Sequence, residues 1–439
     1  MIHRNTDPAR RRRTAGVLAA IALVATMAGI APAQARTVHV SRDFYGMHDG
    51  SLQSFSRVGE GSLRLWDAGV EWRQVETRPG HYDWSRLDQI VTAAQAAHVK
   101  VTMVVAMTPH FYRKNPTKPP HDLQHYRDFV KAMMQRYRNF NGKRGIDAYQ
   151  VWNEANVVNF WTGTPKQMAQ LTQSLWKVRN HYDKGAKVIA PPMTTRFLAQ
   201  LGWMQRYDKQ KVGGRHVWRY YDTVALNLYP QATYNGRPGL PEDAMNLLAL
   251  ARKRLSDVGV PRSKPIWNTE VNYGLQTGTK AGHRAKGIAA QRQASYVIRT
   301  FILNAAYGVK RVFWYRYDWN TLRGGGTLGN TLLSKPGNPN RLTLAGNALV
   351  LVRSWLHGRL LGAGGTPCQV DAKGTYHCVV KDSTGIRRIY WNPTRSVTVR
   401  LAPGAREKQT ISGGYTSVKG GSNLKVDYRP VMVDAHHHA

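Results

Sequence analysis

Residues 101–106 read Val101-Thr102-Met103-Val104-Val105-Ala106, and this apolar run, with the segments that follow it, decides the fold. Residues 122–140 carry apolar side chains at helical spacing, and residues 149–152 (Tyr149-Gln150-Val151-Trp152) form a second short apolar run. The apolar helical positions are Tyr126, Phe129, Val130, Met133, Met134 and Tyr137. A strand, a helix and a second strand in this order are typical of a βαβ unit, whose two strands lie parallel in one sheet.

The same alternation extends along the chain in both directions. Further strands are predicted at residues 44–48, 62–66, 187–190, 224–229, 265–269 and 311–315. Further helices are predicted at residues 84–98, 165–182, 242–258, 286–307 and 342–356. Eight strands with intervening helices predict an α/β fold, a (β/α)8 TIM barrel, over residues 36–357.

The pattern changes at about residue 358, where long helical segments end. Short β-like runs follow at residues 369–370, 376–381, 388–391, 397–401 and 428–433. They predict a small all-β sandwich domain over residues 358–434, followed by a tail at 435–439. Cys368 and Cys378 flank a turn-like stretch, so we expect a disulfide across a hairpin.

The first 35 residues have the features of an export signal. Arg10 to Arg13 form a basic region, and residues 15–30 are apolar but too short to favour a membrane span. Ala33-Gln34-Ala35 fits a small-x-small cleavage site, which places the mature N-terminus at Arg36. We therefore expect a bacterial protein that is secreted or associated with the cell wall, without a transmembrane anchor.

Charge is the unusual feature of the composition. The chain has 63 Lys and Arg against 26 Asp and Glu, a net charge of +37. Residues 1–35 contribute five Arg and one Asp, which leaves +33 on the rest. Such a charge attracts acidic polysaccharides, an anionic cell wall or nucleic acid, or it only aids solubility. The sequence has no zinc-ligand spacing, nucleic-acid module or continuous basic helix, so we expect no dedicated nucleic-acid binding.

Two glutamates stand at the ends of predicted strands. Glu154 follows Tyr149–Trp152 and Asn153, and Glu270 follows the strand at 265–269. A buried strand end gives a charge no structural role, although Glu154 would also suit a helix start. Strands four and seven of a barrel can direct both carboxylates at one mouth. Two carboxyl groups ~5–5.5 Å apart can cleave a glycosidic bond, one as acid and one as nucleophile.

The motifs around these glutamates resemble those of glycoside hydrolase clan A, and of family 39 in particular. The similar segments are Leu63–Asp67, Gly80–Trp84, Trp152–Asn156, Phe160–Trp161 with Gly163, and Trp267–Glu270. The clan usually has Pro after the first glutamate, where this sequence has Ala155. The resemblance implies a retaining glycosidase that acts on a carbohydrate without metal or cofactor, with Glu154 as acid/base and Glu270 as nucleophile.

The resemblance also implies roles for further residues. Arg64 would keep the nucleophile ionised, unless it is a surface ion pair, and Tyr229 would hydrogen-bond Glu270, unless it is a core tyrosine. Trp314 would form the floor of a sugar subsite, unless it only packs the barrel. His48 and His110 could contact substrate hydroxyls, although a loop histidine is more often incidental. Asn153 could hydrogen-bond the sugar 2-hydroxyl, unless it is an ordinary turn residue.

Three alternatives to a hydrolase remain open. The chain could be a non-catalytic binder of an anionic wall polymer, a transglycosylase using the same two glutamates, or a nucleic-acid binder, which only the charge favours. The glycan itself is not specified by the sequence. Basic residues in or beside the loops predicted around the mouth could contact an acidic polymer; they are Lys114, Lys118, Arg237, Lys280, Arg284 and Lys286.

Overall fold

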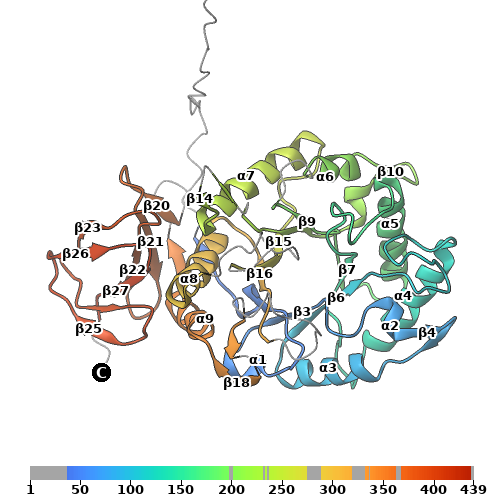
Figure 1. The fold of residues 1–439 in the computed structure, drawn as a ribbon, viewed down its shortest axis with the longest axis horizontal. Helices are drawn as coiled ribbons and strands as arrows, with labels where there is room; N and C mark the ends of the chain where they lie inside the picture. Colours follow the sequence, from blue (N-terminus) through green and yellow to red (C-terminus); the bar gives the residue numbers. More distant parts are fainter. Residues whose placement is uncertain are drawn as a thin grey trace, which may run out of the picture.

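The computed structural model places the predicted strands in one curled parallel sheet (Figure 1). It describes residues 37–196, 201–230, 233–234, 237–273, 288–318, 332–335, 337–361 and 367–436. The strands of this sheet are β2 (Tyr45–Met47), β3 (Ser62–Leu65), β6 (Lys100–Val105), β7 (Ala148–Val151), β8 (Lys187–Ile189), β9 (Met193–Thr194), β12 (Val224–Asn227), β15 (Ile266–Val271) and β16 (Arg311–Trp314). The predicted signal at residues 1–35 lies outside the described residues.

The sheet closes into a barrel. Its strand order is β8-β7-β6-β3-β2-β16-β15-β12-β9, and every described pairing in it is parallel. The Ala190 amide donates to Thr223 O at 2.9 Å, and the Asp222 amide donates to Val188 O at 2.8 Å. These bonds join β8 to the start of β12, so β8 and β9 together act as the fifth of eight barrel strands among the described residues. The predicted (β/α)8 fold is confirmed.

Helices surround the barrel, and the longer ones bury apolar side chains. They are α1 (Ser54–Arg57), α2 (Trp72–Val75), α3 (Ser85–Ala96), α4 (Leu123–Tyr137), α5 (Pro165–Tyr182), α6 (Leu201–Asp208), α7 (Pro241–Asp257), α8 (Ala290–Ala306) and α9 (Leu344–Trp355). On α4 the six predicted apolar positions are all fully buried. Sequence signals fix the helix starts as well: the Asp122 carboxylate caps α4, and Thr164 caps α5 at Pro165.

The segments that connect the barrel strands and helices contain short elements. They are the 3-10 turns η1 (Arg42–Phe44) and η3 (Val217–Tyr220), and the strands β4 (Glu76–Arg78), β5 (His81–Tyr82), β10 (Lys211–Val212), β11 (Arg215–His216), β13 (Thr233–Tyr234), β14 (Arg237–Pro238), β17 (Ser334–Lys335) and β18 (Asn338–Leu342). Among the described residues, no helix is both long enough and apolar enough to cross a bilayer.

The C-terminal region is all β, as predicted. Its strands are β19 (Arg359–Leu361), β20 (Cys368–Val370), β21 (Tyr376–Lys381), β22 (Ile386–Trp391), β23 (Val397–Arg400), β24 (Glu407–Gln409), β25 (Tyr415–Ser417), β26 (Asn423–Val426) and β27 (Val431–Asp434). The main sheet has the order β1-β19-β21-β22-β27-β24-β25, and β23 pairs with β26. Its edge strand β1 (Val38–His39) precedes the first barrel strand in the sequence, and the sequence analysis did not predict this pairing.

The predicted disulfide is present between Cys368 and Cys378. The two cysteines are directly opposite each other in the antiparallel pair β20–β21, and both are buried. The bond therefore closes the hairpin that begins the C-terminal sheet.

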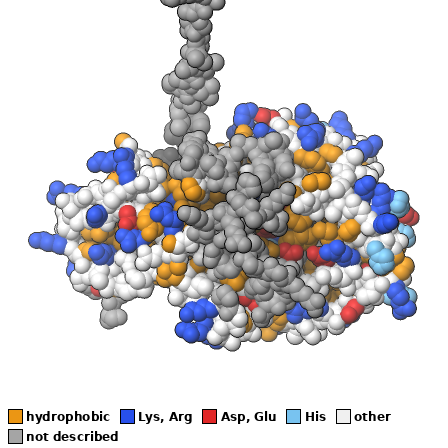
Figure 2. Space-filling model, viewed as in Figure 1, with side chains coloured by type: hydrophobic (Ala, Val, Ile, Leu, Met, Phe, Trp, Pro, Cys, Tyr) orange, Lys and Arg blue, Asp and Glu red, His pale blue; other side chains and the backbone are white. Residues whose placement is uncertain are grey.

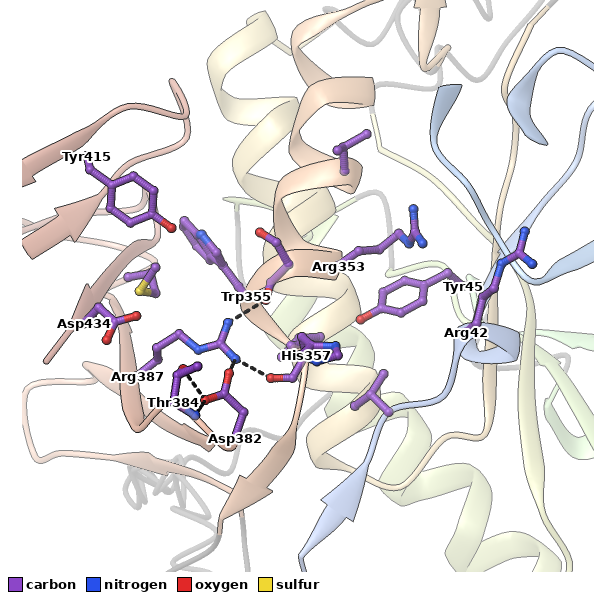
Figure 3. A pocket seen from close by; sticks show the side chains of 15 residues that line it. Arg42, Tyr45, Arg353, Trp355, His357, Asp382, Thr384, Arg387, Tyr415 and Asp434 are labelled. Carbon is purple, nitrogen blue, oxygen red and sulfur yellow. Dashed lines mark hydrogen bonds and ion pairs between the residues drawn. The ribbon is translucent and has the colours of Figure 1, made fainter. Parts of the chain in front are cut away.

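A cleft of about 560 Å³ opens where α9 meets the C-terminal sheet (Figure 3). Arg387 crosses its wall: its Nη1 donates to Ser354 O at 2.6 Å, and its Nη2 contacts His357 O and the Asp382 carboxylate. Arg387 thus satisfies carbonyls at the C-terminal end of α9, where a cation is favourable. The cleft lies at the domain boundary and is not lined by either predicted catalytic glutamate.

Candidate active site

The carboxyl ends of the barrel strands form the mouth at which the predicted site residues lie. Four non-glycine residues that follow barrel strands have positive φ: Asp67 (56°), Met107 (67°), Trp152 (59°) and Glu154 (33°). Such conformations cost roughly 1–3 kcal/mol each and concentrate at functional sites. These four residues lie at the end of the barrel at which TIM-barrel enzymes carry their active sites.

Glu270 is held by two donors from neighbouring strands. The residue lies in β15 and is 8% exposed. Arg64 Nη1, from β3, donates to Glu270 Oε2 at 3.2 Å, and the Tyr229 hydroxyl, just beyond β12, donates to Oε1 at 2.6 Å. Both donors stabilise the ionised carboxylate. The structure thus brings together the three residues that the sequence analysis grouped.

Glu154 faces Glu270 across the mouth. Its Oε1 accepts a 3.0 Å hydrogen bond from Asn227 Nδ2, and the same nitrogen lies 3.5 Å from Glu270 Oε2. The two oxygens can therefore be no farther apart than the sum of these distances, 6.5 Å. Carboxyl groups that act by direct attack are ~5–5.5 Å apart, and those that leave room for a water are ~6.5–9.5 Å apart. These two oxygens are therefore close enough to be compatible with direct attack by Glu270.

Asn227 is the site residue that sequence reasoning missed. The Thr269 hydroxyl donates to Asn227 Oδ1 at 2.8 Å, which fixes the amide with its Nδ2 toward the two carboxylates. A signal was available, because Asn227 is a polar residue at the end of an apolar strand, just as the two glutamates are. A buried amide between two acids can donate to either of them as charge moves between them.

Arg64 is the centre of the buried polar network. It is 1% exposed, so it is not a surface ion pair. Its Nε donates to Gln150 Oε1 at 2.9 Å, and its Nη2 donates to Asn153 Oδ1 at 2.7 Å. His48 Nε2 lies 3.3 Å from Arg64 Nη1 and 3.1 Å from Thr269 O. The guanidinium is thereby locked, and it places Asn153 beside Glu270.

Burial raises the pKa of both glutamates, and the two influence each other. For Glu154, burial is the main cause, opposed by the Asn227 hydrogen bond and the charge of Arg196. For Glu270, burial and the charge of Glu154 raise the pKa, while Arg64 and Tyr229 lower it. Because the stronger donors all serve Glu270, the negative charge belongs there and a shared proton belongs on Glu154. Burial and the charge of Arg64 also lower the pKa of His48, which keeps its ring neutral.

Trp314 does not face the mouth, so its predicted role as the floor of a sugar subsite is wrong. Its side chain is fully buried and packs against Tyr273, which itself contacts Tyr296 of α8. Successive strand residues point to opposite faces, so the next residue, Tyr315, faces the site. The Tyr315 ring contacts His48 edge-to-face, 5.0 Å between centroids, and its hydroxyl donates to Asp67 Oδ2 at 2.7 Å.

The remaining predicted binding residues that the structure describes are His110, Lys114 and Lys118, on the loop after β6. His110 is exposed on the loop after β6, where its ring contacts Phe111, so the structure does not bring it into the carboxylate cluster. Lys114 and Lys118 lie on the same loop, with Lys114 exposed. Lys280, Arg284 and Lys286 lie outside the described residues, as does the side chain of Arg237. Within the described parts of the chain, no three His, Cys, Asp or Glu side chains are grouped to hold a metal ion.

Comparison with known proteins adds independent evidence for the fold. No protein-family model matches the chain. A β-xylosidase of Geobacillus stearothermophilus is 28% identical over 116 residues, and the match covers 23% of this chain and 23% of the xylosidase. The shared segment is thus less than a quarter of that relative's length.

Solved structures match over nearly the whole chain. A family 39 glycoside hydrolase from Bacteroides cellulosilyticus WH2 has a TM-score of 0.66 at 15% identity, over 90% of this chain and 82% of that one. A glucosidase from Croceicoccus marinus has a TM-score of 0.64 at 12% identity, over 91% and 96%. A GH30 endoxylanase from Clostridium papyrosolvens C71 has a TM-score of 0.56 at 12% identity, over 90% and 97%. The chain therefore has the fold of these (β/α)8 glycoside hydrolases, and the predicted resemblance to clan A is confirmed at the level of the fold.

Proposed function

We propose that this protein is a retaining glycoside hydrolase, with Glu154 as the acid/base and Glu270 as the nucleophile. The observation that carries the proposal is the single Asn227 amide nitrogen that reaches both carboxylates at the barrel mouth. Arg64 and Tyr229 add the donors that an ionised nucleophile requires. The similarity of one segment to a β-xylosidase supports a β-glycoside as the substrate.

The reaction proceeds in two displacements. In the first, Glu270 attacks the anomeric carbon while Glu154 gives its proton to the leaving oxygen, and a glycosyl-enzyme ester forms. In the second, Glu154 takes a proton from water, which attacks the anomeric carbon and releases Glu270. Asn153, held by Arg64, is placed to bond the 2-hydroxyl, an interaction that strengthens in the transition state.

A panel of aryl glycosides tests the proposal. We expect at least one 4-nitrophenyl β-glycoside to be cleaved with net retention, observed by NMR of the first-formed product. Glu154→Gln should lower kcat on unactivated leaving groups by roughly 10²–10⁴-fold, because the proton donor is lost. Glu270→Gln should reduce turnover to background. Asp257→Asn, on the exposed face of α7, is the matched control and should be fully active.

Covalent labelling separates the two glutamates. A dinitrophenyl 2-deoxy-2-fluoro glycoside of the preferred sugar should label Glu270 and no other residue, as detected by peptide mass spectrometry. Product inversion, or a label on a residue other than Glu270, would refute the proposed roles. Absence of both cleavage and labelling across the panel would favour a non-catalytic carbohydrate binder.

We further propose that the protein is exported from a bacterial cell. The basic and apolar segments of residues 1–35 support this, and so does the Cys368–Cys378 disulfide, since such bonds persist mainly outside the cytosol. Expression of the full chain with N-terminal sequencing tests it. We expect the extracellular protein to begin at Arg36; full-length protein retained inside the cell would contradict the proposal.

A further inference from the structure

Arg196 is a cation at the mouth that the reaction itself does not require. It lies two residues beyond β9, and its guanidinium carbon is 4.2 Å from the centroid of the Tyr229 ring. The Tyr229 hydroxyl donates to Glu270, so one side chain, that of Tyr229, links Arg196 to the proposed nucleophile. A cation–π contact of this kind does not use the five N–H donors of the arginine.

We propose that Arg196 binds an anionic group, a carboxylate or a phosphate, on the leaving-group part of the substrate. This inference rests on the proposed glycosidase function and adds a substrate class to it. The target would be an acidic polymer in which the unit following the cleaved bond carries the negative charge.

The surroundings of Arg196 differ from those of Arg64. Among the described residues no acidic side chain forms an ion pair with Arg196, whereas Arg64 bonds both Glu270 and Asn153. Arg196 is also partly exposed, in contrast to the fully enclosed Arg64. A partly exposed arginine is suited to bidentate binding of a carboxylate or phosphate.

The charge of Arg196 opposes the protonation of Glu154 unless an anion binds Arg196. Its positive charge lowers the pKa of Glu154, which must be protonated at the start of the reaction. A bound anion would cancel this effect and let the pKa of Glu154 rise. The right substrate would then improve the acid that cleaves it.

The arrangement of charges assigns the anion to the leaving-group side. Arg196 follows the fifth barrel strand, which lies beside the fourth strand that leads to Glu154. The charge of Arg196 lowers the pKa of Glu154, the group that faces the leaving oxygen. On the other side of the mouth, Asp67 receives the Tyr315 hydroxyl, and its charge raises the pKa of Glu270. Asp67 would repel an anionic sugar bound over the nucleophile, so the glycone should be neutral.

Matched aryl glycosides test this inference. The glycone is the neutral sugar that the 4-nitrophenyl panel identifies, and the phenol carries a meta-carboxylate, a meta-carboxamide or a meta-phosphonate. We expect the wild-type protein to prefer the carboxylate or phosphonate over the carboxamide by about tenfold or more in kcat/KM, the scale of a charge-assisted contact. The arm with the larger preference identifies the natural anion.

The variants assign the preference to one residue. Arg196→Gln should bring the ratio of anionic to neutral kcat/KM close to one, and Arg196→Lys should keep part of it. Arg219→Gln is the control, because Arg219 also stacks on an aromatic ring, that of Trp218, but lies before β12 at the opposite end of the barrel. It should keep the wild-type ratio.

The outcomes for the two proposals are distinct. Equal kcat/KM for charged and neutral aglycones in the wild type, or an unchanged ratio in Arg196→Gln, would overturn the inference and leave the glycosidase intact. If no glycoside is cleaved, the proposed function fails, and equilibrium dialysis decides the inference: meta-carboxylate and meta-carboxamide phenyl glycosides of each neutral sugar in the panel are dialysed against the wild type and Arg196→Gln. Preferential, Arg196-dependent binding of the carboxylate would support it, and equal binding would refute it.

Discussion

Thr269 and Asn227 show how a neutral pair positions two acids. The Thr269 hydroxyl donates to Asn227 Oδ1, and this leaves Nδ2 directed at Glu154 and Glu270. Without that hydroxyl the amide could rotate by half a turn and present an oxygen to two carboxylates. Thr269 never touches the substrate site directly, so it is a positioning residue.

Replacing Thr269 tests this arrangement. We expect Thr269→Val to lower kcat/KM by roughly tenfold, because one oriented donor to the carboxylate pair is lost. The Asn227 hydrogen bond lowers the pKa of Glu154. Its loss should therefore raise that pKa and move the alkaline limb of the kcat/KM profile to higher pH, as measured with the preferred aryl glycoside.

Thr269→Ser is the matched control, because it keeps the hydroxyl. It should restore both the rate and the position of the alkaline limb. A Thr269→Val enzyme that is slower but has an unshifted pH profile would indicate a purely structural role for Thr269.

Polar residues at strand ends were the most informative single positions in the sequence. Glu154, Glu270 and Arg64 each interrupt an apolar run, and burial without a function would be costly for them. The direction of Trp314 could not be predicted, because the sequence does not specify the pairing register, and a register slip of one residue moves every side chain to the other face of the sheet. Tyr315 takes the place beside His48 for this reason.

Among the elements, the link between α1 and β3 contains a buried acid that the reaction does not use. Glu60 is fully buried, and its Oε1 contacts the Ser54 hydroxyl. The Ser54 hydroxyl donates to Asp49 Oδ2 at 2.6 Å, so it has no second proton for Glu60. A protonated Glu60 can instead donate to Ser54, which completes the chain of hydrogen bonds. Burial raises the pKa of Glu60 to about 7.

The raised pKa makes stability depend on pH. The folded state binds the Glu60 proton more tightly than the unfolded chain does, so the stabilisation is complete below the unfolded pKa near 4.5 and is lost as pH rises through about 7. Glu60→Gln removes this dependence. Relative to the variant, the wild type should lose up to about 3 kcal/mol of unfolding free energy between pH 4.5 and pH 8, as measured by urea denaturation.

The exposed acid Asp257 provides the control for this measurement. Its Asn variant should show the same pH dependence as the wild type, since Asp257 is solvated on α7. A Glu60→Gln protein whose stability parallels that of the wild type at every pH would mean that Glu60 titrates normally.

The positions of most helices and strands could be predicted from local sequence signals, but the pairing of distant strands could not. The eight barrel strands and the helices α3, α4, α5, α7, α8 and α9 lie within a few residues of their predicted positions, because each carries a clear apolar period. The pairing of β1 with β19 joins residues more than 300 positions apart, and no local pattern specifies such a contact. Strands β24, β25 and β26 escaped prediction because they are only three or four residues long and carry few apolar side chains.

In the whole molecule, the barrel and the C-terminal sheet share one apolar core. Trp391 of β22 is fully buried, and its Nε1 donates to Glu242 Oε1 of α7 at 2.8 Å. Glu242 is also bound by Arg299 Nε of α8, at 2.8 Å. The Glu242–Arg299 ion pair lies in the barrel domain, and Trp391 of the C-terminal domain donates to the same carboxylate. Because a buried carboxylate is costly without its donors, the folding of the two domains is coupled.

We expect Trp391→Phe to destabilise both domains together. The substitution removes a donor from a buried carboxylate, which should cost about 1–3 kcal/mol of unfolding free energy. Hydrogen exchange of amides in α8 and β22 should accelerate by a similar factor, because both are exposed in the same unfolding event. Acceleration confined to β22 would show that the C-terminal domain unfolds independently.

The net charge of the whole molecule should affect its association with anionic polymers. Figure 2 shows Lys and Arg side chains over both domains on this face, with few acidic ones. The chain beyond residue 35 carries +33, and such a field concentrates the protein on anionic polymers at low ionic strength. Salt shortens its range from about 10 Å at 0.1 M to about 3 Å at 1 M, so the association should weaken steeply with salt.

Binding to bacterial wall fragments measures this effect separately from catalysis. The inactive Glu270→Gln protein should sediment with phosphate-bearing wall fragments at 50 mM NaCl and be released well below 1 M. Fragments stripped of their anionic polymers should retain little of it. Arg196→Gln should bind the fragments as well as the wild type does, because one charge is a small part of +33, whereas the same substitution should remove the aglycone preference. Salt-independent retention would instead point to specific recognition of a wall component and would separate wall binding from the overall charge.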